Sequence, residues 1–365
     1  MGEEFRFQGG TYASFTNEDH KRWFEECRAK GWTAPNWPSE YGGGGFSAQH
    51  SAIIWEEMRR VDAIRPLNGT GLSMAGPAIL KFGTEELKTR ILPLIASGQT
   101  CWCQGFSEPG AGSDLASLQM RADPDGDSYV VNGSKIWTSF AHRADWMFAL
   151  VRTDASVKHK GITFLLIDMK TPGIEVRPIR MINGNSVFNE VFFSNVRVPR
   201  DNVVGAENQG WSVAKYLMER ERDTVADFGF NGDLDLSQYA RAAGLVQGNQ
   251  ISDPALRLKL AQTEIDSWAF DSSLARFAEA TEMGIESGVY SSVLKYCGSR
   301  AYVARAEMVV DLLGIQGLEW EPETNHGAQE PASQAWLLSK AVPILGGTSE
   351  IQLNIISKNL LGLPS

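Results

Sequence analysis

The sequence predicts an α+β protein in which a middle antiparallel β domain separates an N-terminal helical domain from a C-terminal four-helix bundle. Apolar residues follow helical spacing up to about residue 100, alternate at strand spacing from 101 to about 205, and return to helical spacing afterwards. A chain of 365 residues is long enough for two or three domains with substantial cores. We therefore expect domains over residues 1–100, 101–205 and 206–365.

The N-terminal region contains three helical segments separated by turns. The stretch TNEDHKRWFEECRAKGW opens with a capping box from Thr16 to Asp19 and closes at Gly31. The segments SAQHSAIIWEEMRRVDA and TEELKTRILPLIASG repeat the helical pattern, and the glycine-rich loop EYGGGGF precedes them. This part of the chain is therefore expected to be a helical domain.

The middle region reads as short strands punctuated by glycine and proline. In DSYVVNGSKIW, Asn132 and Gly133 stand between two β-rich runs, a pair typical of a hairpin turn. Four further runs continue the pattern: WMFALVRT, GITFLLIDM, GIEVRPIRM and NEVFFSNVRVP. Together they predict a compact antiparallel β domain.

Long helical patterns occupy the last region, which ends in a distinctive loop. In ILGGTSEIQ, Gly346 and Gly347 allow a positive φ, and Thr348 or Ser349 can cap the apolar helix that follows. Two interpretations stay open at this point. The segment is either a C-terminal docking helix or a loop whose backbone N–H groups meet a ligand.

Composition excludes several classes of function. The net charge of −10 argues against nucleic-acid or anionic-membrane binding, and no apolar run approaches the ~20 residues that span a bilayer. The first residues, MGEEFRFQGG, have no signal-peptide layout. The four cysteines are scattered and lack metal-ligand spacing. We expect a cytoplasmic protein with reduced thiols, no bound metal and no membrane partner.

The chemistry is concentrated in CWCQGFSEPGAGSDLASLQ and the strand region after it. SEPGAGSD predicts a rigid turn that presents backbone N–H groups and hydroxyls, although a plain tight connection between strands would look the same. Trp137 adds an aromatic plane, with the hydroxyls of Thr138 and Ser139 beside it. This combination suits a flat polar heterocycle such as a flavin.

Over nearly its whole length the sequence resembles the acyl-CoA dehydrogenase family. The resemblance is carried by SEPGAGSDLASL, DSYVVNGSKIWTS, VFFSNVRVPRDNVVGAENQGW and LGGTSEIQLNIISKNLLGLP, in this order and spacing. It implies the three domains above, with FAD between the last two. The first helix is short or missing compared with typical members, so a chain trimmed at its start is expected.

Motif positions carry over roles for residues of the middle domain. The resemblance implies that Phe106 and Ser107 contact the flavin through backbone and hydroxyl. Trp137 should pack on the isoalloxazine, and Ser139 should hydrogen-bond near its reactive edge. Ser113 matches the position that meets the CoA chain.

The C-terminal loop also matches family positions, with one departure. Thr348 and Glu350 stand where members contact FAD. Many members carry the catalytic glutamate where this chain has Gly346. The backbone N–H of Gly346 is expected to hold the thioester carbonyl together with a flavin ribityl hydroxyl.

The implied reaction, α,β-desaturation of an acyl-CoA thioester, needs a carboxylate base. A second family pattern places the glutamate on a helix after an NxGW turn, which here gives Glu221, followed by Arg222 as a substrate contact. ERERD could instead be a solvated helix face, and Glu219 competes from the opposite side of the helix. Glu350 is a weaker candidate, better suited to a cofactor contact or a helix start.

The expected partners are an acyl-CoA, an electron-transfer flavoprotein and a second subunit. Homotetrameric members carry an Arg-x-x-Phe-Gly stretch and a Gln-x-x-Gly-Gly loop that bind the neighbour's FAD diphosphate, and neither DPALRLKLAQTEIDSW nor VVDLLGIQGLEWEPETNHG matches them. The resemblance is to heteromeric members, such as the large subunit of pimeloyl-CoA dehydrogenase and steroid side-chain enzymes, so an α2β2 assembly is expected. An altered homo-oligomer, an oxidase using O2 and a non-catalytic subunit are the alternatives.

Overall fold

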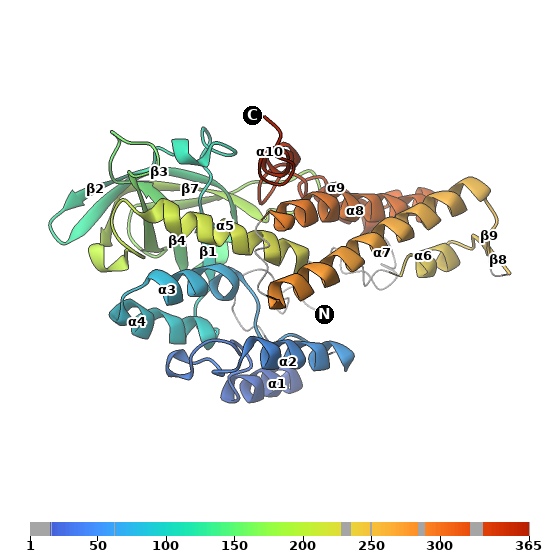
Figure 1. Ribbon diagram of the computed structural model, residues 1–365, viewed down its shortest axis with the longest axis horizontal. Helices are drawn as coiled ribbons and strands as arrows, with labels where there is room; N and C mark the ends of the chain where they lie inside the picture. Colours follow the sequence, from blue (N-terminus) through green and yellow to red (C-terminus); the bar gives the residue numbers. More distant parts are fainter. Residues whose placement is uncertain are drawn as a thin grey trace. The chain divides into compact units, whose positions relative to one another are not determined.

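The computed structural model describes residues 15, 17–61, 63–227, 235–248, 250–283, 289–321 and 331–364 (Figure 1), without the side chains of 219–227, 278, 281 and 282. The chain forms two compact units. The first unit is Met1–Arg180 with Ser186–Leu217, and the second is Met181–Asn185 with Met218–Ser365. Helix α5 (Gly210–Asp227) runs from the first unit into the second.

Three of the four helices that the structure describes in the first unit begin at a residue whose side chain caps a backbone N–H: Asn17, Ser47 and Thr84. The four helices are α1 (Glu18–Ala29), α2 (Ala48–Arg60), α3 (Gly76–Phe82) and α4 (Glu85–Ala96). Helix α1 is capped by Asn17, whose Oδ1 accepts the N–H of His20 at 2.8 Å, so the cap is not the expected Thr16, which lies outside the described residues. Asparagine is among the strongest N-caps, and it fixes the start of the helix one residue later.

Seven strands form a single curled sheet in the first unit. They are β1 (Trp102–Gly105), β2 (Arg121–Asp125), β3 (Ser128–Ser139), β4 (Trp146–Arg152), β5 (Ile162–Asp168), β6 (Ile174–Pro178) and β7 (Phe188–Pro199). The order is β1-β4-β2-β3-β7-β6, with β5 paired to β4. Most pairs are antiparallel as expected, but β4 runs parallel to both β1 and β2.

The hairpin expected at Asn132 and Gly133 is wrong, because both residues lie inside strand β3. They face an irregularity opposite β7, where Asn132 Oδ1 accepts the N–H of Asn195 at 2.8 Å. Gly133 has a φ of +138°, and a Cβ there would stand 2.9 Å from the Cα of Met120. The turn that joins β2 to β3 is Gly126-Asp127, with φ +61° at Gly126. The same Asn-Gly pair thus serves close backbone approach rather than chain reversal.

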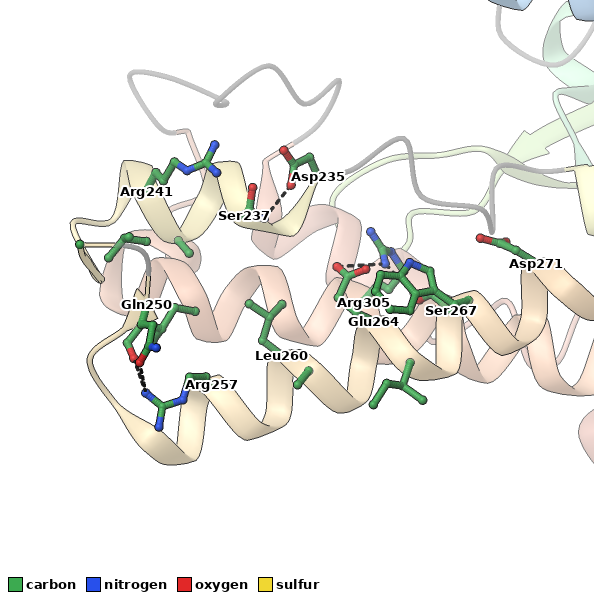
Figure 2. Close-up of a pocket in the computed structure, with 17 residues that line it drawn as sticks. Asp235, Ser237, Arg241, Gln250, Arg257, Leu260, Glu264, Ser267, Asp271 and Arg305 are labelled. Carbon is green, nitrogen blue, oxygen red and sulfur yellow. Dashed lines mark hydrogen bonds and ion pairs between the residues drawn. The ribbon is translucent and has the colours of Figure 1, made fainter.

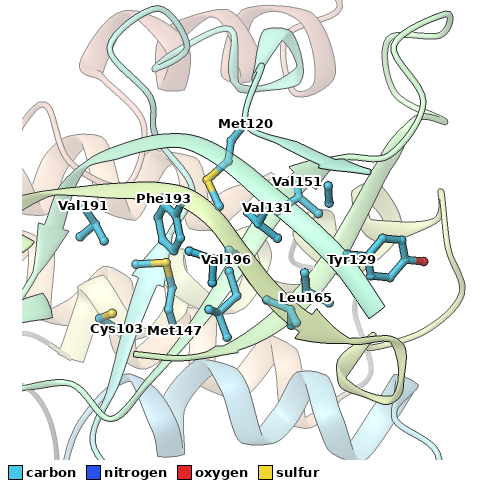
Figure 3. Close-up of a cluster of buried hydrophobic side chains, with 14 of the residues drawn as sticks. Cys103, Met120, Tyr129, Val131, Met147, Val151, Leu165, Val191, Phe193 and Val196 are labelled. Atoms are coloured by element: carbon cyan, nitrogen blue, oxygen red, sulfur yellow. The ribbon is translucent and has the colours of Figure 1, made fainter. Parts of the chain in front are cut away.

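The core of the sheet is apolar and fully closed to solvent (Figure 3). Met120, Val131, Met147, Leu165 and Phe193 all belong to it, each at most 3% exposed. Strands β4 and β5 are buried on both faces along nearly their whole length, whereas β7 alternates in its first half. Alternation marks a strand with one wet face, and a continuous apolar run marks one covered on both sides.

Hydrogen bonds join the helical part of the first unit to its sheet. The hydroxyl of Thr70 donates to the carbonyl of Trp102 at 2.7 Å, and Arg90 donates to Asn202 Oδ1 at 2.6 Å. The N–H of Gly205 donates to the carbonyl of Phe82. These bonds belong to one compact unit, whereas the sequence predicts a domain boundary near residue 100; that boundary stays a prediction.

The second unit is helical, as the sequence predicts. It holds α6 (Leu236–Ala242), α7 (Pro254–Glu282), α8 (Tyr290–Leu313), α9 (Ala332–Ser339) and α10 (Ser349–Asn359), with the short strands β8 (Val246–Gln247) and β9 (Gln250–Ile251). Buried residues of α6 and α8, among them Leu236, Met308 and Leu312, form its main apolar cluster. In the described part of the chain, no helix has the length and apolar character to cross a membrane.

Arg152 at the end of β4 fastens the loop that follows the SEPGAGSD turn. Its side chain is 7% exposed and donates to the carbonyl oxygens of Ala116 and Leu118, and to those of Val157 and Lys158. A lysine has three donors on one nitrogen and cannot reach all four acceptors.

We expect Arg152→Lys to lower the free energy of unfolding by about 2–4 kcal/mol, because buried carbonyls lose their partners. The measurement is a thermal or denaturant melt. Arg177→Lys, in an exposed pair with Glu175, is the control and should change stability by less than about 1 kcal/mol. Equal melting of the two variants would contradict this role of Arg152.

Candidate functional site

Trp137 lies in a bulge of strand β3, held in a strained conformation. Between Lys135 and Thr138 the register against β7 shifts by one residue, and Trp137 has a φ of +60°. Trp137 is 56% exposed, and its ring contacts the ring of Phe188 edge-on, with the two centroids 6.1 Å apart. A positive φ is unfavourable for a bulky residue and is retained where a bulge re-aims a side chain. The bulge thus presents an indole face outward.

Asn189 secures the bulge from the facing strand. Its buried Nδ2 donates to the carbonyl of Thr138 at 3.0 Å and to that of Val187 at 3.2 Å. Its Oδ1 lies 3.2 Å from Nδ1 of His142. Because Thr138 follows Trp137 directly, these bonds hold the C-terminal side of the strained residue.

Phe106 and Ser107 lie beside this bulge and differ in burial: Phe106 is buried and Ser107 is half-buried. The ring of Phe106 is 6% exposed and packs edge-on to Phe148 and Phe164, so it belongs to the core and leaves only backbone for a ligand. The carbonyl of Ser107 accepts the N–H of Ile136 at 2.9 Å. The structure therefore brings residues 106–107 next to residues 135–137, as the motifs require.

A buried ion pair lies beneath these two segments. Lys135 is fully buried, and its Nζ donates to Glu108 Oε1 at 2.8 Å and to the carbonyl of Phe106 at 3.1 Å. The two oxygens of Glu108 also accept the N–H groups of Gln119 at 2.6 Å and Met120 at 2.9 Å. Burial lowers the pKa of Lys135 to about 8, opposed by the carboxylate of Glu108. Sequence analysis missed this pair, although both residues lie inside the quoted motifs.

Two hydroxyls predicted for the site remain available. Ser107 and Ser139 are half-buried, and neither hydroxyl hydrogen-bonds to another residue that the structure describes. Thr138 Oγ1 is buried without a partner in the same part of the chain. Ser113 is exposed, beyond the tight turn closed by Glu108 and Ala111. Trp137 and these donors all belong to the first unit.

In the second unit, the Gly346-Gly347 loop is pinned by its carbonyl groups. Lys295, 1% exposed on α8, donates to the carbonyls of Pro343 at 3.1 Å and Gly347 at 2.7 Å. Gln352 Nε2 donates to the carbonyls of both glycines at 3.2 Å. Both glycines have positive φ, and a Cβ at Gly347 would stand 2.6 Å from Gln352 Nε2. The carbonyls are used internally, while neither glycine N–H donates to another described residue.

Thr348 and Glu350 start the helix that follows this loop. Thr348 is the N-cap of α10, and its Oγ1 accepts the N–H of Ile351 at 3.3 Å. The N–H of Glu350 itself, with Thr348, lowers the pKa of the exposed Glu350 carboxyl. A base needs the opposite shift, so Glu350 suits a helix start better than proton abstraction.

Glu221 and Arg222 fall in helix α5, but their side chains lie outside what the structure describes. The same holds for Glu219. Their place on a helix agrees with the expected pattern, and their roles remain predictions from the sequence.

A hollow lies wholly within the second unit (Figure 2). It has a volume of about 830 Å³ and is lined by residues of α6, α7, α8 and the β8–β9 turn. Arg305 is 6% exposed, donates to Ser267 Oγ at 3.0 Å and lies 3.6 Å from Glu264. Trp268 is 66% exposed at its wall. The sequence did not predict this hollow.

Comparison with known proteins gives the family. Models of the N-terminal, middle and C-terminal domains of acyl-CoA dehydrogenase match residues 12–99, 103–196 and 208–361. Acyl-CoA dehydrogenase IpdE1 of Mycobacterium tuberculosis is 37% identical over 355 residues, covering 95% of this chain and 89% of the relative. The chain belongs to the acyl-CoA dehydrogenase family, and the fold class expected from the sequence is confirmed.

Solved structures agree with this assignment. The Tcur3481-Tcur3483 steroid ACAD superposes with a TM-score of 0.81 at 30% identity, covering 95% of this chain and 90% of that one. The ChsE4-ChsE5 complex from Mycobacterium tuberculosis superposes with a TM-score of 0.77 at 29% identity, covering 96% and 91%. The protein is thus an enzyme of a flavoprotein family that oxidises acyl-CoA thioesters.

The residues of the first unit fit the flavin that this family carries. An exposed indole supplies a stacking face, and donors come from the SEPGAGSD backbone and from the hydroxyls of Ser107 and Ser139, which have no partner within the described ranges. Glycines 110 and 112 have no atom within 4 Å of a would-be Cβ, so the turn is open on that side. Nothing in this donor set conflicts with a planar polar ring.

We expect Trp137→Gly to raise the thermal stability of the cofactor-free protein by up to about 1 kcal/mol, because glycine adopts the positive φ without strain. The exposed indole loses little burial. Trp137→Ala, which keeps the strain, is the matched control and should not stabilise. If both variants melt alike, the conformation of Trp137 stores no strain.

Proposed function

We propose that this chain binds FAD and desaturates an acyl-CoA thioester between Cα and Cβ, with Glu221 as the base. The observation that carries the proposal is the strained, outward-facing Trp137, in the same unit as the hydroxyls of Ser107 and Ser139, which bond to no other residue that the structure describes. Bound FAD supplies the acceptor for the hydride that leaves Cβ. A merely structural subunit would have no reason to retain a strained aromatic residue at its surface.

The other predicted residues bind FAD or the acyl-CoA. Trp137 stacks on the flavin ring, the backbone of Phe106 and the hydroxyl of Ser107 contact it, and Ser139 bonds near its reactive edge. Thr348 and Glu350 contact FAD from the start of α10. Ser113 and Arg222 meet the acyl-CoA.

Proton abstraction requires polarisation of the thioester, because a Cα–H bond is far too weakly acidic for an unaided carboxylate. The carboxylate of Glu221 takes the α-proton, and the electron pair of that C–H bond forms the double bond as the β-hydride leaves. The N–H of Gly346 donates to the thioester oxygen. Support for this comes from the loop itself, whose carbonyls are occupied by Lys295 and Gln352.

The test of the base is Glu221→Gln with Glu219→Gln as its matched control on the same helix. We expect Glu221→Gln to retain FAD but to lose bleaching of the flavin absorbance by substrate at least 10³-fold, a barrier increase of about 4 kcal/mol. Glu219→Gln should bleach at the wild-type rate. The substrates are short, dicarboxylyl, aromatic and steroid acyl-CoAs; the relative named a steroid ACAD favours the last.

Unchanged bleaching in Glu221→Gln would refute the assignment of the base. The electron acceptor is tested in the same samples. We propose an electron-transfer flavoprotein, so reduced enzyme should reoxidise faster with that protein than with air-saturated buffer. The reverse order would identify an oxidase.

We further propose that a homologous second subunit completes the enzyme. The two solved structures compared above are each named for a pair of proteins, Tcur3481-Tcur3483 and ChsE4-ChsE5. In addition, the segment DPALRLKLAQTEIDSW lacks the pattern that serves a neighbour's FAD in homotetramers. Helix α7 exposes Leu258, Ile265 and Trp268 by 72%, 53% and 66%. Apolar side chains exposed in a row are typical of a protein interface.

Coexpression with a co-encoded homologue should give an α2β2 mass by light scattering. Trp268→Ser should weaken that assembly, whereas Ile53→Ser, at an apolar residue of α2 that is 54% exposed, should leave it intact. A homo-oligomer with one FAD per chain would contradict the second subunit.

A further inference from the structure

The ion pair of Lys135 and Glu108 has no part in the chemistry proposed above, yet both side chains are buried and hydrogen-bonded to the backbone. Lys135 has 0% and Glu108 8% of its side chain exposed. A buried pair loses much of its attraction to desolvation, and apolar residues of similar size often stabilise a core equally well. Stability alone therefore does not account for two charges at this place.

The hydrogen bonds of the pair reach both segments of the expected flavin site. From Lys135 one bond goes to the carbonyl of Phe106, the residue before Ser107, and one to Glu108, the residue after it. Ser107 is thus flanked on both sides by groups tied to the same ammonium. On strand β3, Trp137 lies two residues beyond Lys135, within the bulge.

Glu108 extends the connection to a third segment. Its two oxygens accept the N–H groups of Gln119 and Met120, at the entry to β2. The N–H and the carbonyl of Glu108 also pair with Ala111 across the tight turn. Both oxygens of the carboxylate and two of the three ammonium donors therefore have a described partner, so these bonds fix the two side chains relative to three backbone segments.

We propose that Lys135 and Glu108 are positioning residues for FAD, which fix the distance and angle between the Trp137 ring and the Ser107 hydroxyl. The inference rests on the proposed FAD site. Neither residue needs to touch the cofactor. Their effect is transmitted by the backbone of residues 106–108 and 135–137.

The test measures FAD affinity by titrating the cofactor-free full chain, with any copurifying partner, and following flavin fluorescence. We expect Lys135→Met, nearly isosteric and apolar, to weaken FAD binding at least 30-fold. Glu108→Gln should weaken it about 10-fold, and the double variant should be no weaker than Lys135→Met, because the two residues act as a unit. Val131→Ala, a buried truncation on the same strand, is the stability control and should change affinity less than 3-fold.

A pH profile separates positioning from a general loss of packing. Lys135 faces the carboxylate of Glu108 and, farther away, the guanidinium of Arg152, and its pKa lies near 8. Between pH 7 and pH 9 the ammonium loses its proton and Glu108 loses its counter-charge. Wild-type affinity should then fall at least 5-fold, whereas Lys135→Met should show no such step.

Each outcome decides between the two proposals. A wild-type chain without affinity for FAD, both alone and when coexpressed with the homologous subunit, overturns the proposed function and this inference together. A wild-type chain that binds FAD, with Lys135→Met and Glu108→Gln both within 3-fold of it, overturns the inference alone. The same holds if Val131→Ala weakens binding as much as Lys135→Met. If Lys135→Met fails to fold, Glu108→Gln and the wild-type pH profile still decide the question.

Discussion

The salt bridge between Lys135 and Glu108 is the constraint on which the first unit's site depends. It joins the middle of β3, the turn after β1 and the entry to β2 at one buried point. Removing one member of such a pair strands the other charge in the core, at a cost of about 3–5 kcal/mol. Segments that are distant along the chain are therefore held in one arrangement before any ligand arrives.

The same principle operates separately in the second unit. Lys295 and Gln352 take up the carbonyls of the Gly346-Gly347 loop, just as Lys135 takes up the carbonyl of Phe106. In both places a buried donor binds backbone oxygens from the inside and leaves the N–H or hydroxyl side of the peptide for a ligand. Preorganised donors of this kind are worth most where charge develops during a reaction.

The sequence predicted the architecture and the exposed Trp137, but it did not predict the buried lysines, Lys135 and Lys295, that bind the backbone around the two loops. Helix and strand periods gave the α+β order correctly, and Trp137 was singled out by its hydroxyl neighbours. The Asn132-Gly133 pair misled, because Gly133 serves close approach to Met120 inside β3 while Gly126 makes the turn. Lys135 and Lys295 were not singled out from the sequence, since their burial and their partners depend on long-range packing that a local pattern does not contain.

The attachment of Gln352 gives helix α10 a role beyond covering its neighbours. Because Gln352 in its first turn donates to the carbonyls of Gly346 and Gly347, the order of the glycine loop depends on helix α10 being present and folded. Proteolytic trimming before Gln352 would release two of the four carbonyl bonds at once, whereas an affinity tag added after Ser365 leaves them untouched. For anyone handling this enzyme, an intact tail is a condition of an ordered loop.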